Sequence, residues 1–155
     1  MQDVVKLVNA TKNPRDAALI SCFYESNTRP HEFLNLKWTD IDPQCIPIKK
    51  RDNNGNTVET MMDVVYLNVD GKPGPRRTFV VFRVPFLVAW KKAYPKGADG
   101  YIWIDIENNL EQLKYAAANK VVRSAAKRAG ISENIKLYSF RHGKNTEVSE
   151  VLSYA

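Results

Sequence analysis

Cysteine and histidine are scarce in this sequence. It holds two of each in 155 residues, and the cysteines, Cys22 and Cys45, lie far apart with no second pair and no histidine cluster beside them. A disulfide framework needs several spaced cysteine pairs, and a zinc site needs clustered cysteines and histidines. The sequence therefore predicts reduced thiols and no metal site.

Long apolar runs are also missing. No segment approaches the roughly 20 apolar residues that a membrane-spanning helix needs. The N-terminus, MQDVVKLVNA, lacks the basic start and apolar stretch of a secretory signal. We therefore expect an intracellular protein without a membrane partner. Apolar residues make up 44% and charged residues 26% of the chain, which is typical of a single folded domain.

Acidic residues are absent from one long segment and nearly absent from another. Segment 71–96 has seven basic residues and no acid, and segment 114–144 has eight basic residues and only Glu133 as an acid. The first 42 residues, by contrast, hold five basic and six acidic side chains. This distribution fits a solvated surface, and it equally fits a polyanionic partner such as nucleic acid.

Capping residues and apolar spacing predict several helices. Asn13 and Pro14 are typical of a helix start, and apolar residues at helical spacing continue to about Asn27. Thr28 can cap a short second helix, and Pro85 opens another. The apolar residues of a longer helix step by three and four ahead of a terminating Gly130: Leu110, Leu113, Ala117, Val121 and Ala125.

Runs of β-branched and aromatic residues predict three strands, at 46–49, 64–69 and 78–84. Between the last two lies 71–75, where two glycines and two prolines predict a hairpin turn that presents Lys72. Segments 39–43 and 52–56 are predicted to be a turn and a polar loop. A last helix is predicted over 139–152.

Three motifs carry a resemblance to a known family. Segment 24–41 contains Arg29 followed three residues later by Glu32, then leucine, tryptophan and aspartate; segment 71–77 places Lys72 at a hairpin tip; and 138–142 reads Tyr-Ser-Phe-Arg-His. In this order and spacing they resemble the tyrosine recombinase (phage integrase) family, archaeal members in particular. The resemblance implies an α+β fold, mostly helical with a small antiparallel three-stranded sheet, as in the integrase catalytic domain.

The resemblance also implies roles for individual residues. Family members join a tyrosine to a DNA phosphate without a metal or cofactor, so protein side chains must neutralise the phosphoryl oxygens. Arg29 and Arg141 match the two arginines that do so, Lys72 matches the general acid, and Glu32 matches an acid that orients its neighbours. The remaining candidates are listed here: Tyr138 and His142 in the active site, and Arg76, Arg77, Lys127 and Lys144 as DNA contacts.

Two departures from the family pattern bear on activity. Tyr138 stands where the family has a histidine, and it cannot titrate near neutral pH. Tyr154 comes too early, by spacing, to be the nucleophilic tyrosine. We therefore expect residues 1–155 to be a catalytic domain that is incomplete at its C-terminus and lacks the family's N-terminal core-binding domain.

Several functions remain open on the sequence alone. The leading one is site-specific recombination or integration on double-stranded DNA, with self-association of the protein on that DNA. The same fold could instead serve as a non-catalytic DNA-binding fragment or a degenerate copy. A type IB topoisomerase shares the tyrosine, arginine and lysine chemistry, and a basic α+β module unrelated to recombination would require the three motifs to be coincidental.

Overall fold

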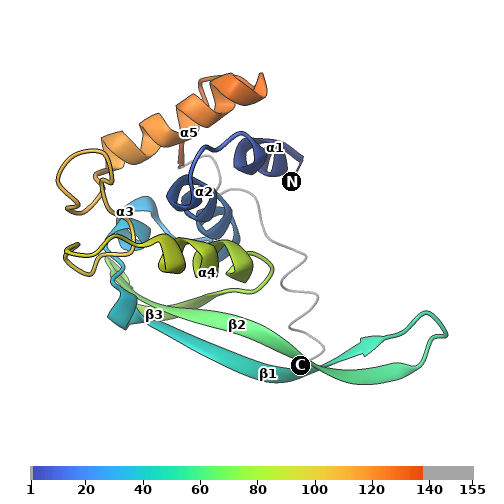
Figure 1. Ribbon diagram of the computed structural model, residues 1–155. Helices are drawn as coiled ribbons and strands as arrows, with labels where there is room; N and C mark the ends of the chain where they lie inside the picture. Colours follow the sequence, from blue (N-terminus) through green and yellow to red (C-terminus); the bar gives the residue numbers. More distant parts are fainter. Residues whose placement is uncertain (1, 138–155) are drawn as a thin grey trace.

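The computed structural model describes residues 2–137, and these form an α+β fold (Figure 1). Tyr138, Arg141, His142, Lys144 and the helix predicted over 139–152 lie outside the described residues. The elements in chain order are α1 (Gln2–Asn9), α2 (Pro14–Ser26), α3 (Pro30–Leu34), the 3-10 helix η1 (Trp38–Asp40), β1 (Ile41–Arg51), β2 (Thr57–Gly71), β3 (Gly74–Val80), α4 (Val84–Ala93) and α5 (Tyr115–Ala129).

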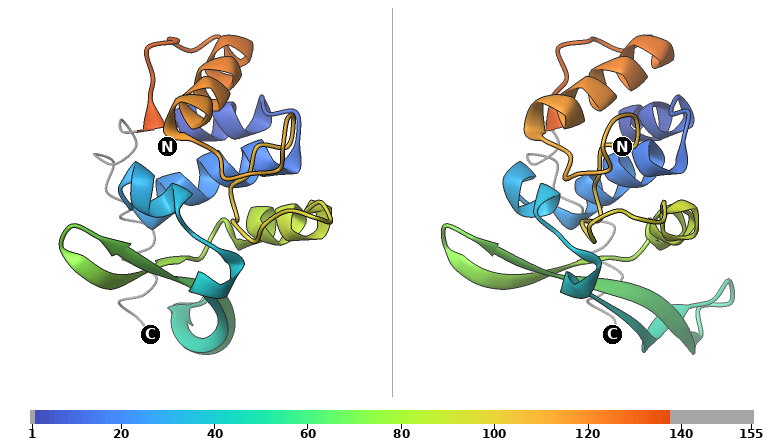
Figure 2. Two further views of the ribbon diagram at one scale, coloured as in Figure 1. Left: turned by 90° about the vertical axis from the view of Figure 1, so that its left-hand side faces the viewer. Right: turned by 60° about the vertical axis from the view of Figure 1, so that its left-hand side comes forward.

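Helix α2 is the central element and has the boundaries that its sequence predicts. The Asn13 side chain accepts a hydrogen bond from the backbone N–H of Asp16 at 2.9 Å, Pro14 is the first helical residue, and Asn27 ends the helix at φ 53°. Nearly every residue of α2 is buried. In Figures 1 and 2 it lies between α5 on one side and the sheet on the other, so the core surrounds it.

The three strands form one antiparallel sheet in the order β1-β2-β3. Gly71 pairs with Gly74, which leaves Lys72 and Pro73 as a two-residue turn. Gly74 has φ 99°, a conformation that glycine adopts without strain. The predicted hairpin with Lys72 at its tip is therefore confirmed. Figure 2 shows this hairpin projecting away from the helices.

The junction between strand β3 and helix α4 differs from the one predicted from the sequence. The strand predicted over 78–84 begins earlier, at Gly74, and ends at Val80. Its ladder stops because the buried Glu25 carboxylate of α2 accepts the backbone N–H groups of Val81, Phe82 and Arg83 at 2.9–3.0 Å. Those N–H groups thus leave the sheet, and α4 starts at Val84.

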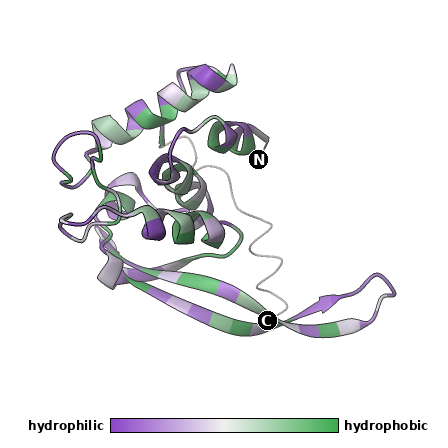
Figure 3. Ribbon diagram, viewed as in Figure 1, coloured by the Kyte–Doolittle hydropathy of each residue, from purple (hydrophilic) through white to green (hydrophobic). Residues whose placement is uncertain are grey.

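Beyond the end of β3, strands β1 and β2 pair only with each other and form a two-stranded arm, residues 44–64. The predicted turn over 39–43 is wrong in part, since η1 occupies 38–40 and β1 already starts at Ile41. The predicted polar loop is present at the end of the arm. There Asp52 accepts the backbone N–H groups of Asn54 and Asn56 at 2.9 Å, and Figure 3 shows this tip as hydrophilic.

Two predicted helix starts are also corrected. The N-cap of α3 is Arg29 and not the predicted Thr28. The Thr28 hydroxyl instead lies 3.0 Å from that of Ser26. Helix α5 begins at Tyr115 rather than near Leu110, which has φ 60°. The chain before α5 is extended because the backbone N–H of Leu113 donates to the carbonyl of Trp103 at 2.9 Å. Gly130 ends α5 at φ 72°, as predicted.

Candidate functional site

Helix α3 places Arg29 and Glu32 on its first turn. Arg29 is the N-cap and Pro30 follows it, so the turn is preorganised by the proline ring. The backbone N–H of Arg29 donates to Oε1 of Glu32 at 3.0 Å. The Glu32 side chain is fully buried, whereas that of Arg29 is 33% exposed. The family-like spacing of arginine and glutamate thus has a local structural basis, a helix cap.

The second Glu32 oxygen is bound from the sheet. Nη1 of Arg76, on β3, donates to Oε2 of Glu32, while Nη1 of Arg29 stays 3.9 Å from Oε1. Gly71 packs directly against the same carboxylate, since a Cβ added there would lie 2.8 Å from Cδ of Glu32 and closer still to Oε2. Only a glycine fits this approach, and the sequence had indicated Gly71 merely as a turn residue.

Burial alone would raise the pKa of Glu32. The hydrogen bond from Arg76, the backbone N–H of Arg29 and the two positive charges outweigh burial and hold that pKa below its ordinary value of 4.5. Glu32 is therefore ionised at neutral pH. The site is a buried carboxylate that links α3 to the β2–β3 hairpin through Arg76, with the Arg29 guanidinium beside it.

This shift predicts how stability depends on pH. Because the folded-state pKa of Glu32 is depressed, its contribution is complete above about pH 4.5 and is lost as the pH falls through the folded-state value. We expect wild type to be more stable than Glu32→Gln at pH 7 and this difference to shrink below pH 4.5. Urea titrations of both proteins at a series of pH values measure it. A difference that does not change between pH 7 and pH 3 would contradict the assignment.

Lys72 lies in the exposed turn next to Gly71, and hence beside the residue that touches Glu32. The structure thus brings Arg29, Glu32 and Arg76 into contact and carries the Lys72 backbone to the same end of the sheet. The predicted convergence of Arg29 and Lys72 with Arg141 stays a prediction, because Arg141 lies outside the described residues.

Arg76 and Arg77 point to opposite faces of the sheet. Arg76 pairs in register with Val69, which is buried against the helices, and so it faces α3. Arg77 lies on the other face, where it forms an ion pair with Asp42 and stacks 3.9 Å from the ring centre of Tyr66. The two neighbouring arginines, predicted together as DNA contacts, therefore have different surroundings.

Lys127 does not belong to this group. It is exposed near the C-terminal end of α5, and Figures 1 and 2 show α5 separated from the sheet by α1 and α2. As a DNA contact it remains a prediction that would require a second surface.

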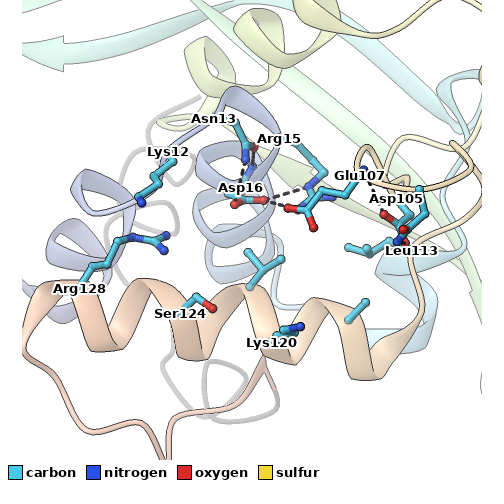
Figure 4. A pocket seen from close by; sticks show the side chains of 13 residues that line it. Lys12, Asn13, Arg15, Asp16, Asp105, Glu107, Leu113, Lys120, Ser124 and Arg128 are labelled. Atoms are coloured by element: carbon cyan, nitrogen blue, oxygen red, sulfur yellow. Dashed lines mark hydrogen bonds and ion pairs between the residues drawn. The ribbon is translucent and has the colours of Figure 1, made fainter.

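A polar cavity of about 270 Å³ lies apart from the arginine site, between α5, the start of α2 and the loop over 105–113 (Figure 4). Its charged lining residues nearly balance: Lys12, Arg15, Lys120 and Arg128 against Asp16, Asp105 and Glu107. Arg15 and Asp16 are buried and pair with each other. The near-neutral balance distinguishes this cavity from the arginine site and gives no preference for a polyanion.

Two further observations concern the described part of the chain. Within residues 2–137, no helix is long and apolar enough to cross a membrane, and no three histidine, cysteine, aspartate or glutamate side chains are placed to hold a metal ion. Both cysteines are free, and burial, together with the charge of Glu25, raises the pKa of the Cys22 thiol to about 12. That thiol is therefore protonated and unreactive at neutral pH.

Solved structures resemble this chain, although neither a protein-family model nor a curated protein matches its sequence. A crystal structure of XerA recombinase matches with a TM-score of 0.66 and 19% identity, over 97% of this chain and 48% of that one. XerH site-specific recombinase bound to palindromic difH substrate, a post-cleavage complex, matches with a TM-score of 0.63 and 17% identity, over 99% of this chain and 45% of that one. The pre-cleavage complex of XerH with difH substrate matches with a TM-score of 0.63 and 17% identity, over 96% of this chain and 42% of that one. This chain therefore has the α+β fold of these recombinase structures and spans less than half of their length.

Proposed function

We propose that this chain is part of the catalytic domain of a tyrosine recombinase and binds the phosphate of a DNA strand that is cut and rejoined. One observation carries the proposal. The Arg29 guanidinium is one-third exposed at the end of α3, and both oxygens of the adjacent Glu32 carboxylate are already occupied by other donors. Within residues 2–137 the Arg29 guanidinium donates no hydrogen bond, so its planar donor fork is available for an anion.

The chemistry of the proposed reaction requires this arrangement. A tyrosine hydroxyl attacks the phosphorus and loses its proton to water, the phenolic oxygen forms the new bond, and the bond between phosphorus and the 5′ oxygen breaks. Negative charge on the phosphoryl oxygens increases in the transition state, and arginines stabilise it. Lys72, on the exposed hairpin turn, would donate a proton to the departing 5′ oxygen. The reverse steps, with another strand's 5′ hydroxyl as nucleophile, rejoin the DNA.

The recombinase structures with difH substrate support double-stranded DNA as the partner, because their fold is the one found here. Arg141 is proposed to bind the same phosphate as Arg29. Arg77, Lys127 and Lys144 are proposed to extend the DNA contacts, and self-association on DNA inside the cell belongs to the same proposal. Tyr138 and His142 would adjoin the phosphate. A protein that binds DNA without cutting it is the alternative outcome.

The first test is the salt dependence of DNA binding. Replacing Arg29 by alanine removes one phosphate contact, so the slope of log affinity against log salt concentration is expected to fall by about 0.9. Fluorescence anisotropy of a labelled 30-base-pair duplex, at several salt concentrations, measures this slope.

The matched control is Arg51→Ala at the tip of the arm. β2 runs from the arm to the hairpin over 15 residues. At a rise of ~3.3 Å per residue, this strand is roughly 45 Å long along its path, so the tip of the arm is far from the hairpin. Arg51→Ala removes the same charge without touching the site, and the slope should not change. An unchanged slope in Arg29→Ala would refute the proposed role of this residue.

A further inference from the structure

We infer that Arg76 is a positioning residue, which neutralises Glu32 and thereby keeps the Arg29 guanidinium free to bind phosphate. This inference rests on the proposed function of Arg29. It replaces the prediction that Arg76 contacts DNA directly, and it makes the β2–β3 hairpin the source of the counter-ion for α3.

Glu32 needs a cation because its carboxylate is buried and ionised. A buried charge without a partner is strongly unfavourable, so the carboxylate will take a positively charged neighbour. Two guanidinium groups lie within 4.0 Å of it in the described part of the chain, those of Arg76 and Arg29. Arg76 forms the direct hydrogen bond, and Arg29 remains at 3.9 Å.

The Arg29 guanidinium therefore lies near the Glu32 carboxylate but forms no hydrogen bond to it. We call the formation of that hydrogen bond the capture of Arg29. Its backbone N–H already occupies Oε1, and Arg76 occupies Oε2. A shift of about 1 Å would bring Nη1 of Arg29 within the ~2.9 Å of a charge-assisted hydrogen bond. Without Arg76, the unpaired Oε2 would attract Arg29, and a guanidinium committed to a buried carboxylate has fewer donors for a phosphate.

The sheet determines which of the two neighbouring arginines can pair with Glu32. Side chains alternate along β3, so Arg76 faces the buried carboxylate while Arg77 faces Asp42 on the opposite side. Gly71, paired across the hairpin with Gly74, lets the backbone of β2 approach the Glu32 carboxylate closely. The same hairpin presents Lys72. The ion pair between Arg76 and Glu32 therefore also ties the base of the Lys72 turn to α3.

The test is a charge-neutralising rescue, measured by the salt slope of binding to the labelled 30-base-pair duplex. Arg76→Ala should lower the slope by about 0.9, as Arg29→Ala does, because Arg29 is captured. Glu32→Gln in the Arg76→Ala background should restore the wild-type slope, because no carboxylate is left to capture Arg29. Arg76→Lys keeps the charge and should stay near wild type. Circular dichroism checks folding, and Arg76→Met, which keeps much of the side-chain volume but has no donor for Glu32, replaces Arg76→Ala if the latter does not fold.

The second ion pair of β3 supplies the control for net charge. Arg77→Ala with Asp42→Asn makes the same charge changes on the other face, and Asp42→Asn should not rescue the slope of Arg77→Ala. Equal rescue in both pairs would overturn the inference, since net charge alone would explain it. If Arg29→Ala lowers the slope but Glu32→Gln does not rescue Arg76→Ala, Arg76 touches DNA itself and the inference is wrong. If Arg29→Ala has no effect, the proposed function fails, and the inference with it.

Discussion

Replacing Glu25 by alanine is expected to remove about 3–5 kcal/mol from the free energy of unfolding, because it leaves three backbone N–H groups without their charged acceptor. The carboxylate is 3% exposed and accepts the N–H groups of Val81, Phe82 and Arg83 at 3.0, 2.9 and 3.0 Å. The free energy of unfolding of a typical domain is only about 5–15 kcal/mol. The loss would thus be a large fraction of its stability.

Guanidinium chloride unfolding, followed by circular dichroism, measures this loss. Glu25→Gln retains one acceptor oxygen and should fall between wild type and Glu25→Ala. Glu59→Ala, an exposed glutamate on the arm, is the matched control and should change the free energy by less than about 0.5 kcal/mol. If Glu25→Ala unfolds at the same denaturant concentration as Glu59→Ala, the three hydrogen bonds do not stabilise the fold.

Replacing Phe33 by alanine is expected to destabilise the fold by about 3–5 kcal/mol, the usual cost of emptying a large aromatic site in a core. Phe33 is fully buried, stacks on Trp103 with ring centres 4.8 Å apart, and meets Phe23 edge-on at 5.1 Å. It directly follows Glu32 on α3, and so the same packing that stabilises the core also holds the site's carboxylate in place.

The control for Phe33 is Phe86→Ala on α4, where the side chain is 38% exposed and little apolar surface is lost. Chemical unfolding of both variants gives the difference in free energy. Equal destabilisation of the two would show that the ring contacts of Phe33 do not contribute more to the free energy of unfolding than an exposed phenylalanine does. A changed denaturant slope in Phe33→Ala would instead indicate that the unfolded or native state itself had altered.

Helix α3 is therefore held from two sides. Phe33 anchors it in the core, and Glu32 ties it through Arg76 to β3. Because α3 has only five residues, it has little stability of its own, and these contacts decide where its N-terminal Arg29 lies. Rigid support of this kind is what the role proposed for Arg29 would require, since preorganised charge costs no rearrangement during a reaction.

Local chemistry allowed several features to be predicted from the sequence. Asn13 and Pro14 set the start of α2, and the glycines and prolines around Lys72 set the hairpin turn, because each acts on the backbone of its immediate neighbours. The spacing of Arg29 and Glu32 indicated the site, and that spacing has its own local cause in the helix cap. The α+β class and the three-stranded sheet were predicted correctly on the same grounds and on the resemblance.

Contacts between distant segments decided the rest. Leu113 belongs to an extended segment rather than to α5 because its N–H bonds to Trp103, and β3 ends at Val80 because Glu25, 56 residues away from Val81, takes the next N–H groups. Arg76 and Arg77 look alike in sequence, yet the register with β2 turns one toward Glu32 and the other toward Asp42. Local propensity carries no information about such partners. The sequence by itself determined which arginines were candidates for the site, and the tertiary structure decided that Arg76 hydrogen-bonds to Glu32 while the Arg29 guanidinium does not.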